Sequence, residues 1–345
     1  MNNKLKRWSK YLVISVAFIA LLVLSGWEFN IDFFKHPLPG SKAMNPVAAI
    51  TFILSSITFF ILTSSRLSTS KKYAGFFLAA LISSIGLLNF LSLFPGLDFH
   101  IDRILFPGKV NTDRIVPAAA FSFMLMGINL LLVNARSKKG VLFINTISLI
   151  IACIGFFSIL GYLYRVKIFY GWLTYLPMAI HAAACFIFLS LAVLLANPEK
   201  GIMKIFTGSY AGSITARRLI PAAIIVPVLL GYLRMVGFRS GIFTTEFGTA
   251  ILVLSIILVF IATIWYSVNQ LNKRDIKNRQ SEKALYESEI QIQTIFNAAP
   301  DGVIMIDEEG KIVKWNPKAE ILFGWKAEEI TGIHLSETII PNRYR

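Results

Sequence analysis

The stretch that decides the fold is residues 248–296, GTAILVLSIILVFIATIWYSVNQLNKRDIKNRQSEKALYESEIQIQTIF. From Gly248 to Tyr266 it contains no charged residue, whereas from Ser267 onward charged and polar residues dominate. The second part contains neither Pro nor Gly, so nothing in it would interrupt a helix. An apolar helix of roughly 20 residues can cross a bilayer. The stretch therefore predicts one continuous helix that leaves a membrane and enters water.

The composition is that of a membrane protein. Of 345 residues, 55% are hydrophobic and only 15% are charged, and the mean hydropathy is +0.65. The net charge of +15 does not indicate nucleic-acid binding, because the cations fall in short clusters between apolar runs. Cys153 and Cys185 lie inside apolar runs and are interpreted as buried small hydrophobes, not as a disulfide framework.

We predict a mainly α-helical, polytopic membrane protein with an eight-helix transmembrane bundle. Each apolar segment is close to the length that a bilayer core requires. The first is interpreted as an uncleaved span, because the cleavage pattern expected of a signal peptide is weak after it. The predicted spans are residues 11–27, 45–64, 74–94, 116–135, 141–163, 175–196, 219–236 and 247–267.

The basic residues of the loops predict the orientation. With the N-terminus inside, the cytoplasmic loops hold about twice as many Lys and Arg residues as the outer loops. This distribution predicts a multi-pass protein of the bacterial inner (cytoplasmic) membrane with both termini in the cytoplasm. The outer loops are too short for a folded extracellular domain, so a stimulus would act on the bundle or on something small bound between its outer ends.

The apolar segments also repeat a pattern. The first, third, fifth and seventh end with a small or polar residue before an aromatic one, and the second, fourth and sixth begin with Pro and small residues. This predicts four tandem helical hairpins of one orientation. The alternative is that Pro at helix starts and aromatics at interfaces are general features of membrane proteins. The pairs are Gly26-Trp27, Asn89-Phe90, Gly161-Tyr162 and Gly231-Tyr232, and the starts are Pro46, Pro117 and Pro177.

His181, near the start of the sixth span, is a functional candidate because ionisable residues inside membranes are costly. The simpler interpretation is a neutral imidazole that bonds to a neighbouring helix. Metal or haem ligation would need a second ligand, and His36 and His100 in outer loops are not linked to His181 by any spacing motif. We therefore predict no metal site and name no cofactor.

In the exit helix, Leu271, Asn278, Leu285 and Ile292 recur at intervals of seven. A coiled coil needs a second apolar position in each heptad, and here that position is mostly polar. The pattern therefore predicts a marginal coiled coil and hence a homodimer through this helix. A marginal pair can change register or splay under a small bias. The alternative is a solvated linker helix with chance apolar spacing.

After Phe296 the pattern changes to strands. Residues 302–307 form a short apolar run, residues 308–310 a turn, and residues 311–315 a second strand, which together predict a hairpin. Asn316-Pro317 then ends the strand, and residues 318–323 with Gly324 at their end predict a short capped helix. Residues 295–341 resemble the first half of a PAS sensory domain in this helix, these strands, the Asn-Pro pair and the pattern that follows Gly324.

The resemblance implies an antiparallel sheet, often with a small-molecule pocket beneath it. The parts of the family that hold haem or flavin would follow Arg345, so the cofactor stays unknown. By the family pattern Asn316 is structural, its side chain fixing the turn after the second strand. Since half a sheet leaves an open core, we expect this polypeptide to be a fragment of a longer protein or an incomplete gene model.

These features predict three parts: a transmembrane sensor domain over 1–267, a signalling helix over 268–296 and the N-terminal half of a PAS domain over 297–345. The arrangement resembles the input half of bacterial sensor histidine kinases of two-component systems, with a downstream kinase and response regulator as partners besides the lipid bilayer. No catalytic domain is expected here, since His334 lacks a following acid and no ATP-binding or GGDEF-like motif occurs. The alternatives are the input region of a diguanylate cyclase, a transporter or channel with a regulatory PAS domain, and a plain membrane anchor.

Overall fold

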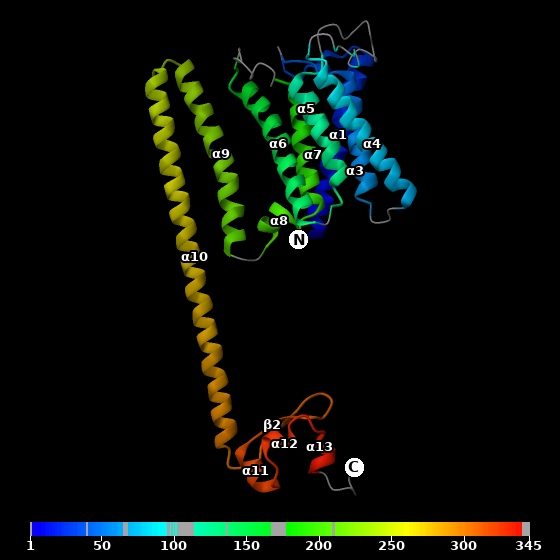
Figure 1. Cartoon of the computed structure of the whole chain (residues 1–345). Coiled ribbons are helices and arrows are strands. Elements are labelled where there is room, and N and C mark those ends of the chain that lie inside the picture. The colour runs from blue at the N-terminus through cyan, green and yellow to red at the C-terminus, as the bar shows by residue number, and fades with distance from the viewer. Residues whose placement is uncertain are drawn as a thin grey trace. The chain divides into compact units, whose positions relative to one another are not determined.

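The computed structural model describes residues 2–38, 41–64, 68–94, 97, 99, 101, 114–135, 137–166, 177–208 and 211–339 (Figure 1). In these ranges the chain is mainly helical. It divides into two compact units, Met1–Ile264 and Trp265–Arg345. The division falls within one helix, close to the predicted exit from the membrane.

Every predicted span coincides with a helix. The helices are α1 (Asn2–Glu28), α2 (Asp32–Lys35), α3 (Pro46–Leu62), α4 (Thr69–Leu91), α5 (Pro117–Leu132), α6 (Lys138–Leu163), α7 (Ile180–Ala196), α8 (Gly201–Thr207), α9 (Ala211–Arg239) and α10 (Thr245–Ala298). Helix α2 is a single turn between the first two predicted spans, and α8 follows the sixth.

The lengths of these helices support the prediction of a membrane protein, but they do not confirm eight membrane crossings. Five described helices, α1, α4, α6, α9 and α10, are long and apolar enough to cross a membrane. A sixth joins them if α7 and α8, which meet at a bend of 76°, form one broken span. Helices α3 and α5 are apolar but only 17 and 16 residues long.

Three of the helices form the centre of the first unit. Helices α3, α5 and α7 contact one another, and each of the outer helices α1, α4 and α6 packs against two of them. Helix α1 lies against α7 and α3, α4 against α3 and α5, and α6 against α5 and α7 (Figure 1). The core is therefore an inner triangle of short helices surrounded by three longer ones.

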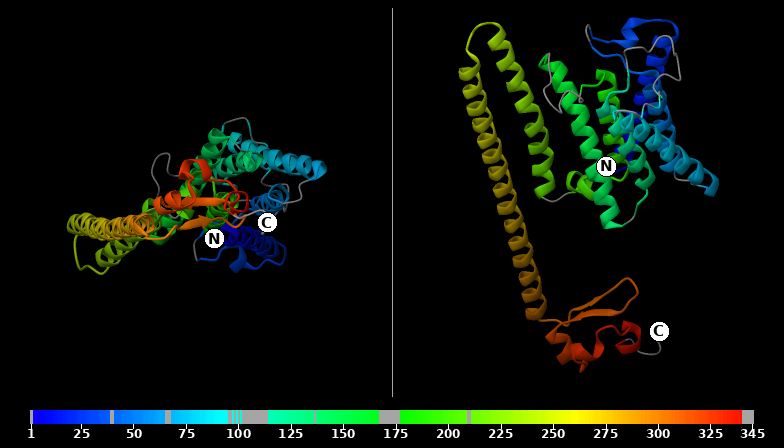
Figure 2. Two further views of the ribbon diagram at one scale, coloured as in Figure 1. Left: turned by 90° about the horizontal axis from the view of Figure 1, so that it is seen from below. Right: turned by 45° about the horizontal axis from the view of Figure 1, so that its top comes forward.

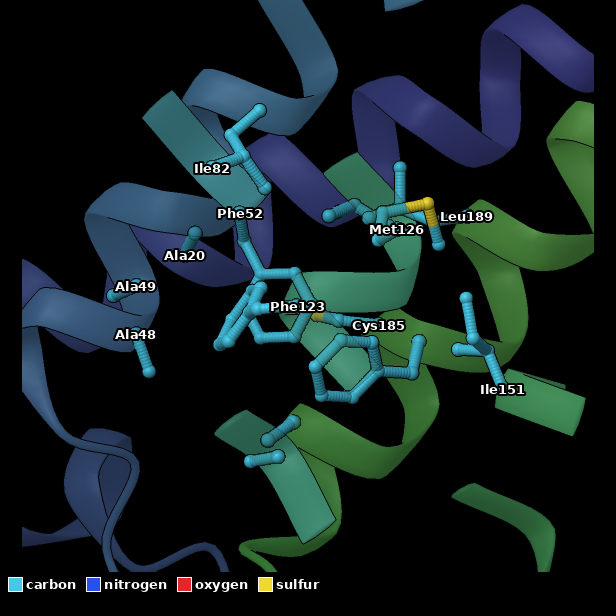
Figure 3. Close-up of a cluster of buried hydrophobic side chains, with 14 of the residues drawn as sticks. Ala20, Ala48, Ala49, Phe52, Ile82, Phe123, Met126, Ile151, Cys185 and Leu189 are labelled. Atoms are coloured by element: carbon cyan, nitrogen blue, oxygen red, sulfur yellow. The ribbon is translucent and has the colours of Figure 1, made fainter. Parts of the chain in front are cut away.

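One phenylalanine from each inner helix meets at the centre. Phe52, Phe123 and Phe186 are at most 1% exposed, and each pair of ring centroids is 4.7 Å apart (Figure 3). Each of them follows the first residue of its helix by the same number of residues. Tilted aromatic pairs at this distance contribute about 0.5–1.5 kcal/mol each beyond the area that they bury. The inner helices are thus structurally equivalent around the three rings.

This equivalence corrects one part of the predicted repeat. The sequence pattern aligned Pro177 with Pro46 and Pro117, which both occupy the first turn of their helices. Helix α7 instead begins at Ile180, and Pro177 precedes it. The three rings pack together only if Phe186 lies level with Phe52 and Phe123. This packing places Ile180, and not Pro177, at the position equivalent to Pro46 and Pro117.

The recurring aromatic residues at the ends of outer helices have a structural role in two cases. The Trp27 indole donates to the carbonyl of Met44 at 2.9 Å, and the Tyr162 hydroxyl donates to the carbonyl of Met178 at 3.0 Å. Each acceptor lies just before the inner helix that follows in the sequence. Since a buried carbonyl without a partner is costly, these bonds fix where α3 and α7 enter the bundle.

Helices α4 and α5 approach each other through two glycines. A Cβ atom on Gly127 would lie 2.5 Å from the backbone nitrogen of Ser83 and 2.6 Å from the carbonyl oxygen of Ala79. A Cβ atom on Gly86 would lie 2.7 Å from the carbonyl oxygen of Ala120. At this contact the two backbones touch, and the Ser83 hydroxyl donates to the carbonyl of Met124 at 3.1 Å.

The second unit contains the predicted strand pair. Strands β1 (Ile304–Ile306) and β2 (Ile312–Trp315) are antiparallel, with an irregularity between Met305 and Ile306. The helices α11 (Pro317–Phe323), α12 (Ala327–Ile330) and α13 (Leu335–Thr338) follow. A small core forms around Ile312, Trp315, Ala319 and Ile330. The two-stranded sheet expected after Phe296 is therefore confirmed.

We predict that Gly127→Ala lowers the midpoint of thermal unfolding in detergent. The added methyl group must push α4 and α5 apart, which typically costs about 1–3 kcal/mol. Gly212→Ala in α9 is the matched control, because a Cβ atom there meets nothing within 4 Å. The control should gain up to about 1 kcal/mol from helix propensity. Equal midpoints for both variants would contradict the close approach.

Candidate functional site

Helix α10 connects the two units without a break. It runs for 54 residues from Thr245 to Ala298, and the right view of Figure 2 shows it as one helix. Its apolar first part is almost entirely exposed on this chain, with 6% of the most apolar window buried. The part beyond Ser267 carries many charged side chains, all within the same helix. At 1.5 Å of rise per residue a helix of this length extends for about 80 Å.

The four predicted seam residues lie on one face of α10. Leu271 is half-buried, whereas Asn278, Leu285 and Ile292 are exposed, with Leu285 at 65% and Ile292 at 55%. Lys283 and Glu287 form a surface pair at 3.7 Å on the same helix, and such exposed pairs add little stability. The apolar stripe is therefore not covered by this chain, and its pairing with a second copy stays a prediction.

Within the second unit, the end of α10 is joined to the strands and to α11 by a buried side chain, Asn316. Its amide nitrogen donates to the carbonyl of Phe296 at 3.1 Å, near the last turn of α10, and to the carbonyl of Asp301 at 3.0 Å. Its side-chain oxygen accepts from the backbone N–H groups of Val303 at 2.9 Å and Ala319 at 2.8 Å. Asn316 is 0% exposed. It thus joins the helix, the start of the sheet and the first turn of α11.

Only an asparagine-type side chain can make this set of bonds at this length. Its oxygen has two acceptor positions and its nitrogen carries two donors, and all four are used. An aspartate would keep the cap on α11 but would face two carbonyls without a proton to donate. The side chain stabilises the turn after β2 and, beyond the predicted role, also fixes the end of α10.

Gly324 ends α11 in a left-handed conformation. Its φ is 79°, and its N–H donates to the carbonyl of Glu320 at 2.9 Å. Glycine adopts this conformation without the steric cost that a Cβ atom adds. The residue turns the chain towards Trp325, whose carbonyl accepts a bond from the Trp315 indole at 3.1 Å. Gly324 therefore has a structural role at the end of α11 and takes no part in the hydrogen bonds of Asn316.

His181 lies in the first turn of α7. Within the part of the chain that the structure describes, neither ring nitrogen has a hydrogen-bond partner, so the bond to a neighbouring helix is not seen. His36 is engaged elsewhere, with its Nδ1 atom 2.9 Å from the carbonyl oxygen of Ser41. His100 lies outside the described residues. No group of three or more His, Cys, Asp or Glu side chains that could hold a metal ion occurs among the described residues.

The sequence did not predict Phe296 as a contact residue. In the structure it is 9% exposed, and its carbonyl is the acceptor that ties α10 to Asn316. Lys314 adds a weaker contact, with its Nζ atom donating to the Gln293 side chain at 3.4 Å. The change from helix to strand pattern directly after Phe296 was the available signal.

Comparisons with known proteins identify the C-terminal segment. Residues 290–345 match the family model described as PAS fold. A 57-residue segment is 40% identical to an uncharacterized protein of Azorhizobium caulinodans, over 16% of this chain and 8% of that protein. The chain thus spans less than a tenth of the length of this relative. No solved structure matches the chain. The PAS resemblance of the C-terminal segment is therefore supported independently of its strand pattern.

We predict that Asn316→Ala loosens the second unit, since each buried group left unpaired costs about 1–3 kcal/mol. Hydrogen exchange measured on residues 1–345 should become faster at Val303 and Ala319, whose N–H groups lose their acceptor. Asn316→Asp should protect Ala319 better than Asn316→Ala does, because the cap on α11 remains. Asn297→Ala, at an exposed position of the same residue type, is the control. Unchanged exchange in both Asn316 variants would show that this side chain does not hold the unit together.

Proposed function

We propose that residues 1–345 form the membrane-embedded input region of a bacterial signal-transduction receptor. The observation that carries this proposal is helix α10, which runs unbroken from an apolar, exposed segment into the segment that matches the PAS fold. A cue that acts on the bundle would move this helix, and the helix would move the unit that Asn316 holds to its end. The PAS-like unit would then pass the change to an output domain.

The topology that we propose has eight spans arranged as four hairpins in the inner membrane, with both termini in the cytoplasm. Its support is the distribution of Lys and Arg between loops and the five or six helices that are long and apolar enough. The short helices α3 and α5 fit this topology because outer helices surround them, so that they contact protein more than lipid.

The output that we propose is a sensor histidine kinase of a two-component system, acting on a response regulator. Its support is the resemblance in architecture, a membrane bundle followed by a long helix and a PAS-like unit. The input region of a diguanylate cyclase would have the same architecture and is the alternative. A transporter has less support: among the described residues the buried charged side chain is Lys35, which pairs with Asp32 at 2.9 Å in α2, at the edge of the bundle.

Insertions in α10 test whether the helix transmits the signal. One to four alanines between Asn272 and Arg279, in the natural gene with any coding sequence that follows, should change the output periodically, because each residue rotates the helix by about 100°. Autophosphorylation would report a kinase, and cyclic di-GMP synthesis a cyclase. An output that is indifferent to all four insertions would reduce α10 to a tether.

Dimerisation through α10 makes a second prediction. Cys153 is exposed, so its interpretation as a buried residue was wrong, whereas Cys185 is buried. With Cys153 replaced by Ser, the variants Leu285→Cys and Ile292→Cys should form disulfide-linked dimers in membranes under mild oxidation. Glu287→Cys is the control, since it lies on the opposite face of the same helix. Band intensities on non-reducing gels measure the result. Equal cross-linking at Leu285 and Glu287 would argue against a seam through Leu285.

A further inference from the structure

A cavity lies where the three inner helices begin. Its volume is about 290 Å³, and it is lined by residues at the N-terminal ends of α3, α5 and α7, in the segments that precede them, and by Leu93 after α4. This volume is near the lower limit for pockets that bind small organic molecules. The cavity belongs entirely to the first unit, and none of the predicted site residues lines it.

Equivalent positions of the three inner helices line the cavity. Ala48, Ala119 and Ala182 line the cavity from the same position in their helices, counted from Pro46, Pro117 and Ile180. Larger side chains at these positions would fill the space. The Phe52, Phe123 and Phe186 rings lie about one turn further along the same helices and pack against one another there. Each inner helix therefore contributes one alanine to the apolar wall of the cavity and one aromatic ring a turn further along.

Among the residues that the structure describes, the charged residues lining the cavity are of one sign. They are Lys42 and Arg114, and both side chains are exposed. The described part of the lining contains no Asp or Glu. In a site with apolar walls an opposite charge would interact with them more strongly than in bulk water. The cavity therefore favours an anion at its charged side.

Two of the three helices also begin without a side-chain cap. Val116 before α5 and Ala179 before α7 cannot accept a hydrogen bond through their side chains, whereas Asn45 before α3 accepts from the Val47 N–H at 2.8 Å. The first N–H groups of a helix need an acceptor from outside the helix, and they carry partial positive charge. Val116 and Ala179 both line the cavity. At α5 the first residue, Pro117, has no N–H and the Ala119 N–H already bonds to the Val116 carbonyl at 3.0 Å. The partial positive charge of the two helix starts and two cations thus lie at the same space.

We propose that this cavity binds a small organic anion, a carboxylate or a comparable anionic group on an apolar body about the size of one ring. The anionic group would lie between Lys42, Arg114 and the starts of α5 and α7. The apolar body would lie against the three alanines, towards the phenylalanines. Binding itself does not depend on the function proposed above, whereas the role of this ligand as the cue rests on it.

Binding is tested on purified residues 1–345 in lipid nanodiscs, with 4-fluorobenzoate as the probe and fluorine NMR as the measurement. Saturable binding is expected for 4-fluorobenzoate and is not expected for 4-fluorobenzamide, which has the same shape without the charge. Inorganic phosphate should not displace the probe. Equal binding of the amide, displacement by phosphate at similar concentration, or no saturable binding of the benzoate would each overturn the proposal.

Variants locate the probe in the cavity. The double variant Lys42→Gln, Arg114→Gln should weaken binding at least roughly tenfold, the effect of losing one charge-assisted hydrogen bond. Both side chains are exposed, so the fold should not change. Lys71→Gln, an exposed cation at the start of α4, is the control for charge. Equal affinity of the double variant and the unchanged protein would place the probe elsewhere.

A volume variant gives an independent readout. Ala119→Leu should abolish binding by filling the space, and Ala80→Leu, at an exposed position on α4, should not. Thermal unfolding is measured in parallel, so that a misfolded Ala119→Leu protein is recognised and Ala182→Leu is used in its place. Binding that survives a folded cavity-filling variant would overturn the proposal. Binding without any change in receptor output would instead leave the site intact and remove its role as the cue.

Discussion

The packing of Phe52, Phe123 and Phe186 against one another is the constraint on which the first unit depends. Three rings at equal centroid distances of 4.7 Å require that three helices meet with their axes close together and in one register. Small residues near each helix start make that approach possible, and the outer helices then pack into the grooves between inner ones. The cavity at the helix starts follows from the same arrangement, because alanines cannot fill the space that the rings leave beyond them.

The three outer helices show how the same arrangement is held in different ways. Trp27 and Tyr162 reach the carbonyls that precede α3 and α7, but Phe90, at the equivalent position of α4, has no group that could donate. There the glycines Gly86 and Gly127 bring α4 and α5 into backbone contact instead. The α4–α5 pair is thus held by close backbone packing, whereas at α1 and α6 hydrogen bonds at the helix ends add to side-chain packing along the helices.

The second unit depends on a single polar side chain in a similar way. Asn316 satisfies two donors and two acceptors that would otherwise be buried without partners, and one of these acceptors belongs to α10. A helix that ends in a fixed hydrogen bond can transmit its orientation to the sheet, whereas a helix that ends in a flexible linker cannot. Asn316 therefore ties the last turn of α10 to the PAS-like segment.

The sequence by itself determined the apolar helices, the continuity of α10 and the strand pair after Phe296, because hydrophobic runs, helix breakers and turn residues act locally. It did not determine the start of α7, where Pro177 suggested a false register, nor the meeting of Phe52, Phe123 and Phe186. It also did not reveal that Lys42 and Arg114, far apart in the chain, line one cavity. Those features were decided by the tertiary structure, because side chains from separate helices must fill one common space, and only their joint packing selects the register and leaves the cavity.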